Sequence, residues 1–259
     1  LSGEVNEAGQ TAVGAEALTA RQFAPVSDGA ALRRLAKSLP LRVPRRRGYR
    51  FRLARRGTRI DLRRALKTAV RNDGEIMALP QLKRRARPRR VLCLIGVSGS
   101  MKERTDAHLR LAHAIAQALP MVETFTFGTR LTRVTRALKL KRRDQALATA
   151  ADLVSDWDGG TRIGDALQAF LAVPRFAGYA RGAIVLVISD GLERGDPAAM
   201  RDAVARLSRR AWRLSWLSPL AIGREFKPET EALKAIMPFL DDLSDGSSID
   251  AITTHILRL

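Results

Sequence analysis

Side chains that carry oxygen ligands occur at three places in the sequence. Ser98 and Ser100 follow a continuous apolar run, Thr161 ends a Gly-rich turn, and Asp190 follows a second apolar run. In open α/β sheets, ligands bind outside the carboxyl ends of the strands. Hydroxyl and carboxylate oxygens suit a hard divalent cation such as Mg²⁺. We therefore predict one crevice, lined by these four residues, that holds a divalent cation.

Strand-like and helix-like segments alternate from residue 91 onward, and they must position these side chains. The apolar runs at 91–97 and 183–188 are typical of strands that are buried on both faces. A helix at 108–119 and a strand at 122–127 follow the first run. This alternation predicts an α/β fold, a doubly wound (Rossmann-like), mostly parallel sheet with helices on both faces.

The remaining expected elements complete this pattern. Further strands are expected at 131–138 and 213–217, and helices at 144–157, 162–171, 197–211, 228–238 and 249–257. Ahead of the sheet we expect a short helix at 30–39 that Pro40 breaks, a strand at 49–53, a helix from Asp61 to about Val70, and a polar run at 83–90 that leads into the sheet.

Several stretches of the sequence resemble a known family. They are WDGGTRIG (157–164), VISDG (187–191), WLSPL (216–220) and DLRRAL (61–66). Together with Ser98, Ser100, Thr161 and Asp190, they resemble the von Willebrand factor A (VWA) family, and more closely its bacterial CoxE-like branch. The metal-ion-dependent adhesion site (MIDAS) of that family reads Asp-x-Ser-x-Ser, with a Thr and an Asp further along. The resemblance extends from about Arg42 to the C-terminus.

The resemblance implies a non-enzymatic adaptor. By this resemblance, we expect the chain to be a partner of a MoxR-type AAA+ ATPase. The pair would act as a chaperone in the maturation of a metalloenzyme, such as a carbon monoxide dehydrogenase-type molybdenum hydroxylase. This chain departs from the MIDAS pattern at one position, because Gly96 stands where the family has its first aspartate. One negative charge is therefore missing, and we expect a cation site that is weakened or empty.

Other candidate residues suggest less. His108 and His113 are five residues apart, whereas two ligands on one helical face are usually four apart. His255 is isolated in the sequence, and Cys93 lies within an apolar run. We expect ordinary core or surface histidines and a buried, inert thiol.

Asp156 and Asp158 flank Trp157 and could help to orient a bound cation, although solvated turn residues are the simpler interpretation. No nucleophilic triad, phosphate loop or dinucleotide fingerprint occurs in the sequence. A further hypothesis is that the chain is a hydrolase or metalloenzyme that acts at the crevice. The sequence offers no general base near the crevice for such a reaction. We therefore expect no enzymatic activity.

Positive charge is concentrated ahead of the sheet. The chain carries a net charge of +20, and residues 33–90 contain 22 basic and 3 acidic residues. We divide the chain into a tail (1–32), an Arg-rich extension (33–90) and a VWA-like domain (91–259). The extension could dock an acidic protein, bind nucleic acid, or serve as a solvated linker. We favour docking and keep nucleic-acid binding as the alternative function.

Cysteine content and hydropathy bear on location. A single cysteine fits a reducing compartment, and no apolar run is long enough for a transmembrane helix. We therefore expect a cytoplasmic protein with no membrane span. The chain begins at Leu1 rather than Met, which leaves room for an upstream segment.

Overall fold

The computed structural model describes residues 28–76, 78–97, 101–154, 162–222, 226, 228 and 230–259, with backbone alone at 102–103. It divides into two compact units, Val43–Arg89 and the chain on either side of that segment. Helix α2 (Asp28–Arg42) belongs to the larger unit, where it contacts α4 (Lys102–Ala118) and α11 (Ile249–Ile256). The first residues of the predicted extension, 33–42, thus belong to the larger unit.

A six-stranded sheet organises the larger unit. Its strands are β4 (Val91–Gly96), β5 (Val122–Phe127), β6 (Leu131–Arg133), β7 (Ile184–Ile188), β8 (Arg213–Ser218) and β9 (Asp242–Asp245). Their order in the sheet is β6-β5-β4-β7-β8-β9, and β6 alone of these pairs antiparallel. The predicted mostly parallel, doubly wound sheet is confirmed.

Strands β4 and β7 lie side by side at the centre of the sheet. All their residues are buried, and the register pairs Val91 with Ile184 and Ile95 with Ile188. A central parallel strand is covered by helices on both faces, which explains why both strands are apolar without alternation. Both therefore end at the same edge of the sheet.

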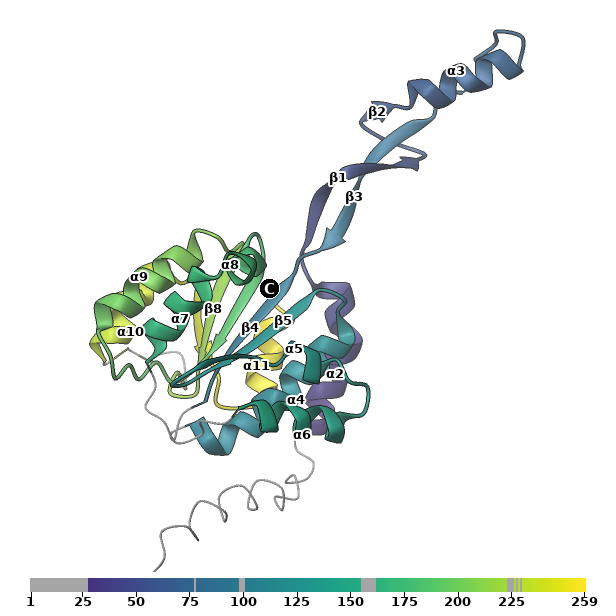
Figure 1. Ribbon diagram of the computed structural model, residues 1–259. Helices are drawn as coiled ribbons and strands as arrows, with labels where there is room; N and C mark the ends of the chain where they lie inside the picture. Colours follow the sequence, from purple (N-terminus) through teal and green to yellow (C-terminus); the bar gives the residue numbers. More distant parts are fainter. Residues whose placement is uncertain are drawn as a thin grey trace, which may run out of the picture. The chain divides into compact units, whose positions relative to one another are not determined.

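Helices cover the two faces of the sheet. Besides α2, α4 and α11 they are α5 (Thr135–Leu138), α6 (Arg143–Leu153), α7 (Ile163–Ala172), α8 (Pro174–Ala180), α9 (Pro197–Ser208) and α10 (Glu231–Ile236), with a 3₁₀ turn η2 at Met237–Phe239. Figure 1 shows α7, α9 and α10 on one face and α2, α4 and α11 on the other. Among the described helices, none has the length and apolar character needed to cross a bilayer.

The smaller unit is built on an antiparallel ribbon. Strand β1 (Arg45–Ala54) pairs with β3 (Gln81–Pro88), and the short β2 (Arg59–Ile60) pairs with the other side of β3. Helix α3 (Leu62–Arg71) follows β2, and the Asp61 carboxylate caps it by accepting a hydrogen bond from the Arg64 N–H at 3.2 Å. The predicted strand at 49–53 and the helix that begins after Asp61 are confirmed.

Three predictions from the sequence were wrong. The predicted strand at 131–138 is a short strand followed by α5. The polar run at 83–90, for which no strand was predicted, lies mostly within strand β3. Helix α2 continues through Pro40 instead of ending there. The helix expected at 228–238 is limited to Glu231–Ile236 before the 3₁₀ turn. Strand β9 and helix α8 were not predicted.

Cys93 lies in the middle of β4 and is fully buried. Burial raises the pKa of the Cys93 thiol to about 12, because the low-polarity interior disfavours the thiolate. We expect iodoacetamide at about pH 8 to leave the folded chain unmodified and to alkylate the thiol once the chain is unfolded in urea. Rapid alkylation of the folded chain, followed by mass spectrometry, would show that this strand opens.

Candidate functional site at the carboxyl edge of the sheet

Asp190 lies in a tight turn directly after β7. Its side chain is only 3% exposed, and its Oδ1 accepts hydrogen bonds from the Leu192 N–H at 3.1 Å and from the Ser189 hydroxyl at 3.4 Å. Gly191 has φ +77, and a Cβ there would lie 2.9 Å from Leu233 Cδ1. Glycine is the residue that reaches this conformation without strain. The turn thus holds a buried carboxylate at the edge where the predicted crevice lies.

Gly96 faces this turn from the neighbouring strand β4. A Cβ at position 96 would lie 3.1 Å from Ser189 Oγ and 3.2 Å from Ser189 Cβ. The two strands therefore approach too closely for most side chains unless Ser189 moves by a few tenths of an ångström. The missing aspartate is accompanied by a packing arrangement that favours glycine at this position.

The N-terminus of α7 is fastened to the same edge by Glu193, a residue that the sequence analysis did not single out. Its Oε2 accepts a hydrogen bond from the Gly164 N–H at 2.7 Å, and its Oε1 accepts one from the Gly195 N–H at 2.5 Å. A carboxylate at a helix N-terminus is also favoured by the helix dipole. Glu193 thereby links the loop that follows Asp190 to the helix that follows Thr161. The sequence gives no signal for it, because the two partners are 29 residues apart.

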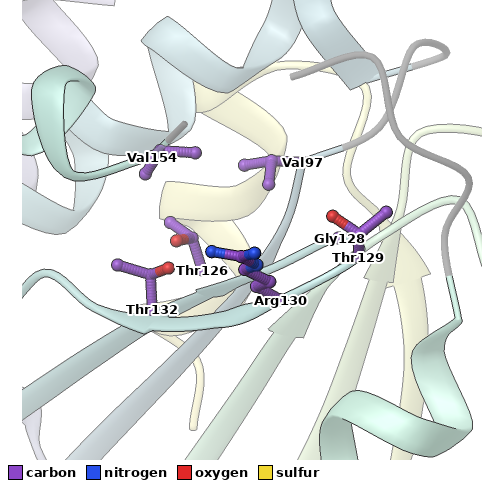
Figure 2. A pocket seen from close by; sticks show the side chains of 7 residues that line it. All are labelled: Val97, Thr126, Gly128, Thr129, Arg130, Thr132 and Val154. Carbon is purple, nitrogen blue, oxygen red and sulfur yellow. The ribbon is translucent and has the colours of Figure 1, made fainter. Parts of the chain in front are cut away.

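A small pocket opens beside the end of β4. It is lined by Val97, Thr126, Gly128, Thr129, Arg130, Thr132 and Val154, whose side chains Figure 2 shows. Its volume of about 10 Å³ is close to what a single water molecule requires. The Thr126 hydroxyl is buried there with no hydrogen-bond partner among the described residues. One bound water would satisfy this hydroxyl.

Of the residues predicted to line the crevice, the structure describes Asp190 and the substituted position Gly96. It places Gly96 beside Ser189, the residue before Asp190. Ser98, Ser100, Thr161, Asp156 and Asp158 lie outside the described residues, so their roles stay predictions. Within the described ranges, no three His, Cys, Asp or Glu side chains gather into a metal-binding group. Asp190 is the one described residue of the predicted donor set, and its carboxylate is buried at this edge.

The comparison with protein families decides the identity. The family described as "VWA domain containing CoxE-like protein" matches residues 31–251, which is most of the chain. The chain belongs to the CoxE-like VWA family. The match includes Val43–Arg89, so the basic unit falls within the family's own extent. Membership of this family supports a non-catalytic VWA adaptor in general terms.

Solved structures similar to this CoxE-like chain include other VWA proteins. The von Willebrand factor type A protein from Catenulispora acidiphila has a TM-score of 0.46 and 18% identity, over 68% of this chain and 43% of that one. Mussel proximal thread matrix protein 1, solved with a zinc-occupied MIDAS motif, has a TM-score of 0.44 and 14% identity, over 65% of this chain and 47% of that one. Manganese-loaded Plasmodium vivax TRAP protein has a TM-score of 0.40 and 18% identity, over 65% of this chain and 73% of that one. No curated protein matches the sequence.

A serine, a histidine and an aspartate of the CoxE-like chain also lie close together near its C-terminus, on β9 and α11. Ser244 Oγ lies 3.0 Å from His255 Nδ1, and His255 Nε2 lies 3.9 Å from Asp242 Oδ2. Both oxygens of Asp242 are already bound by Arg213 at 2.8 Å, and these bonds hold the pKa of Asp242 below its usual value. A triad aspartate must hydrogen-bond its histidine, and 3.9 Å is too far. The cluster instead ties β8, β9 and α11 together.

His108 is a core residue on α4, as expected for an ordinary histidine. Its pKa is lowered to about 4, mainly because burial disfavours the charged imidazolium. A hydrogen bond with the Gly246 backbone raises the pKa, and the positive charge of Arg104 lowers it further. The unfolded chain, with a histidine pKa near 6.5, therefore binds more protons than the folded chain between these two values. It follows that the free energy of unfolding falls as the pH drops from about 6.5 to about 4.

We expect the chain to lose about 2 kcal/mol of unfolding free energy between about pH 7 and about pH 5 through His108. Urea denaturation at the two pH values measures this loss. The variant His108→Gln cannot titrate, so its stability should change less over the same interval. Equal pH dependence in the two proteins would mean that His108 does not control the change.

Proposed function

We propose that this chain is a non-enzymatic adaptor that couples a MoxR-type AAA+ ATPase to a metalloenzyme client. In this role it assists the maturation or activation of an enzyme such as a carbon monoxide dehydrogenase-type molybdenum hydroxylase. The carboxyl edge of the sheet forms the docking crevice, which Ser98, Ser100, Thr161 and Asp190 line. Adaptors of this kind contribute binding and orientation and leave the energy-consuming step to the ATPase.

One observation carries this proposal: the family match extends over residues 31–251, and within it Asp190 is a buried carboxylate held at the ligand-binding edge of the sheet. A buried polar group lowers stability unless hydrogen bonds replace those it made with water. Hydrogen bonds from Leu192 and Ser189 offset part of that cost. The turn is thus prepared to hold a charged group at this edge.

The donor set of the crevice fits a hard divalent cation, Mg²⁺ or another, bound weakly. Ser98, Ser100, Thr161 and Asp190 would supply three hydroxyl oxygens and one carboxylate, and water would complete the shell. With Gly96 in place of an aspartate, the set has one fewer negative charge, so affinity falls. When bound, the cation offers a coordination position to a carboxylate of a partner. The residues of this chain orient that position and provide the walls around it.

Binding of the purified ATPase to the immobilised full chain, measured by biolayer interferometry with ATP and Mg²⁺, tests the proposal. We expect the chain to bind, and we expect Asp190→Asn to weaken the complex about tenfold or more, as for other buried interface charges. Asp202→Asn is the matched control, because Asp202 is an exposed carboxylate on α9. If neither the unmodified chain nor Gly96→Asp binds the ATPase, the proposal is wrong.

A further inference from the structure

The unit Val43–Arg89 has almost no hydrophobic core of its own. Among its described residues, the buried apolar side chains are Val43, Ala65 and Ala69. By contrast, eight large apolar side chains are exposed: Tyr49, Leu53, Ile60, Leu62, Leu66, Val70, Ile76 and Leu79. Small units that cannot bury enough apolar surface usually gain it from a partner. The exposed side chains therefore indicate a binding surface.

The most regular part of this surface is on helix α3. Leu62, Leu66 and Val70 are 67%, 62% and 83% exposed and are spaced four residues apart. This spacing aligns them on one side of the helix, in a row about 12 Å long. We call these three residues the α3 ridge. The adjoining row, Ala65 and Ala69, is buried, so the ridge is narrow.

Positive charge lies along one side of the α3 ridge. Arg63, Lys67 and Arg71 each follow a ridge residue by one position, which places them about 100° further around the helix, on one flank of the ridge. The whole unit contains 17 basic and 3 acidic residues. A partner that covers the ridge must therefore face a strongly positive field, and carboxylates would complement it.

The charge and the shape of the ridge select among possible occupants. A second copy of this chain would bring the same positive charge and be repelled. The phosphates of a nucleic acid would pair with the basic side chains, but they would make no favourable contact with the exposed leucines. An interfacial membrane helix presents a wide apolar face, whereas this row is narrow. A protein groove that accepts side chains at positions i, i+4 and i+8 fits best.

We propose that the α3 ridge inserts into an apolar groove on a protein partner and that carboxylates line the groove beside Arg63, Lys67 and Arg71. This inference rests on the proposed function, since it assigns to the basic unit the contact with one of the adaptor's two protein partners. The crevice at Asp190 and the α3 ridge then belong to different compact units. An adaptor with two such sites can hold two proteins at once.

The test measures binding of the full chain to the purified ATPase and, separately, to the purified client enzyme. We expect one of the two complexes to weaken about tenfold or more in the ridge variants Leu62→Ser and Leu66→Ser, as for apolar side chains at the centre of an interface. Ile222→Ser is the matched control, because Ile222 is an aliphatic residue of the larger unit with 65% exposure. It should change neither complex. Lys67→Glu should weaken the same complex and make its binding less sensitive to salt.

Circular dichroism and thermal melting confirm that the variants fold, and exposed positions such as Leu66 should tolerate serine with little loss of stability. If the ridge variants and Lys67→Glu bind both proteins as tightly as the unmodified chain does, this inference is overturned and the adaptor proposal stays intact. If the chain binds neither protein, both this inference and the adaptor proposal are overturned. Ridge-dependent binding to phosphatidylglycerol vesicles or to a DNA duplex, without ridge-dependent binding to either protein, also overturns it.

Discussion

Gly96→Asp should bind Mg²⁺ about 10- to 100-fold more tightly than the unmodified chain, the range typical for gain or loss of one carboxylate that supports a metal site. Position 96 lies beside Ser189 and so next to Asp190. A carboxylate there adds negative charge to a donor set that otherwise has one. Isothermal titration calorimetry of the two purified proteins with MgCl₂ measures the difference in affinity.

Gly96→Ala is the control that separates charge from packing. Both substitutions add a Cβ at 3.1 Å from Ser189 Oγ, and both should cost about 1–3 kcal/mol of stability through overpacking. Only the aspartate variant should recover stability when Mg²⁺ is added, because a cation that binds the folded state stabilises it. If calorimetry detects no binding in either the aspartate variant or the unmodified chain, there is no cation site at this edge.

Trp216→Ala should lower the free energy of unfolding by about 3–5 kcal/mol. Trp216 is fully buried in β8, packed in the core between the sheet and α7 and α9. Its indole N–H also donates a hydrogen bond to the Ser189 carbonyl at 3.0 Å. Alanine would therefore leave a cavity and an unsatisfied carbonyl at the start of the Asp190 turn.

Urea denaturation followed by circular dichroism measures this loss. Trp212→Ala, at a partly exposed position in the same part of the chain, should cost much less and serves as the control. Since Trp216 holds the Ser189 carbonyl, its loss should also weaken ATPase binding. A variant that keeps full stability would show that the core has no need of this side chain.

The central strands were predictable because their physical signal is strong. The apolar runs that become β4 and β7 reflect burial on both faces, and the alternation of strands with helices fixes the parallel arrangement. The cap at Asp61 was predictable for a local reason, since a carboxylate before a helical pattern satisfies free backbone N–H groups. Such features depend on a few neighbouring residues.

Features that depend on distant partners could not be predicted. Strand β3 contains a basic, Pro-containing run with no apolar alternation, and it forms because β1 pairs with it from far away in the sequence. Pro40 stays within α2 because it lies near the end of a helix whose apolar residues pack on the larger unit. Strand β9 is short and polar, and Arg213 of β8 binds its Asp242.

For the candidate site, the sequence pattern predicted one position but not the geometry around it. The pattern places Asp190 directly after a buried strand, and the structure shows that its side chain is buried there. The close approach of Gly96 to Ser189 depends on the β4–β7 register, which no local pattern encodes. The bridge from Glu193 to Gly164 is equally a product of tertiary structure.

Reconstituted maturation of the client enzyme tests the adaptor role most directly. The inactive client, the ATPase and ATP are incubated with and without the full chain, and client activity is measured. We predict activation when the chain is present, little activation without it, and little activation with Asp190→Asn. Full activation of the client by the ATPase and ATP alone would contradict the adaptor role.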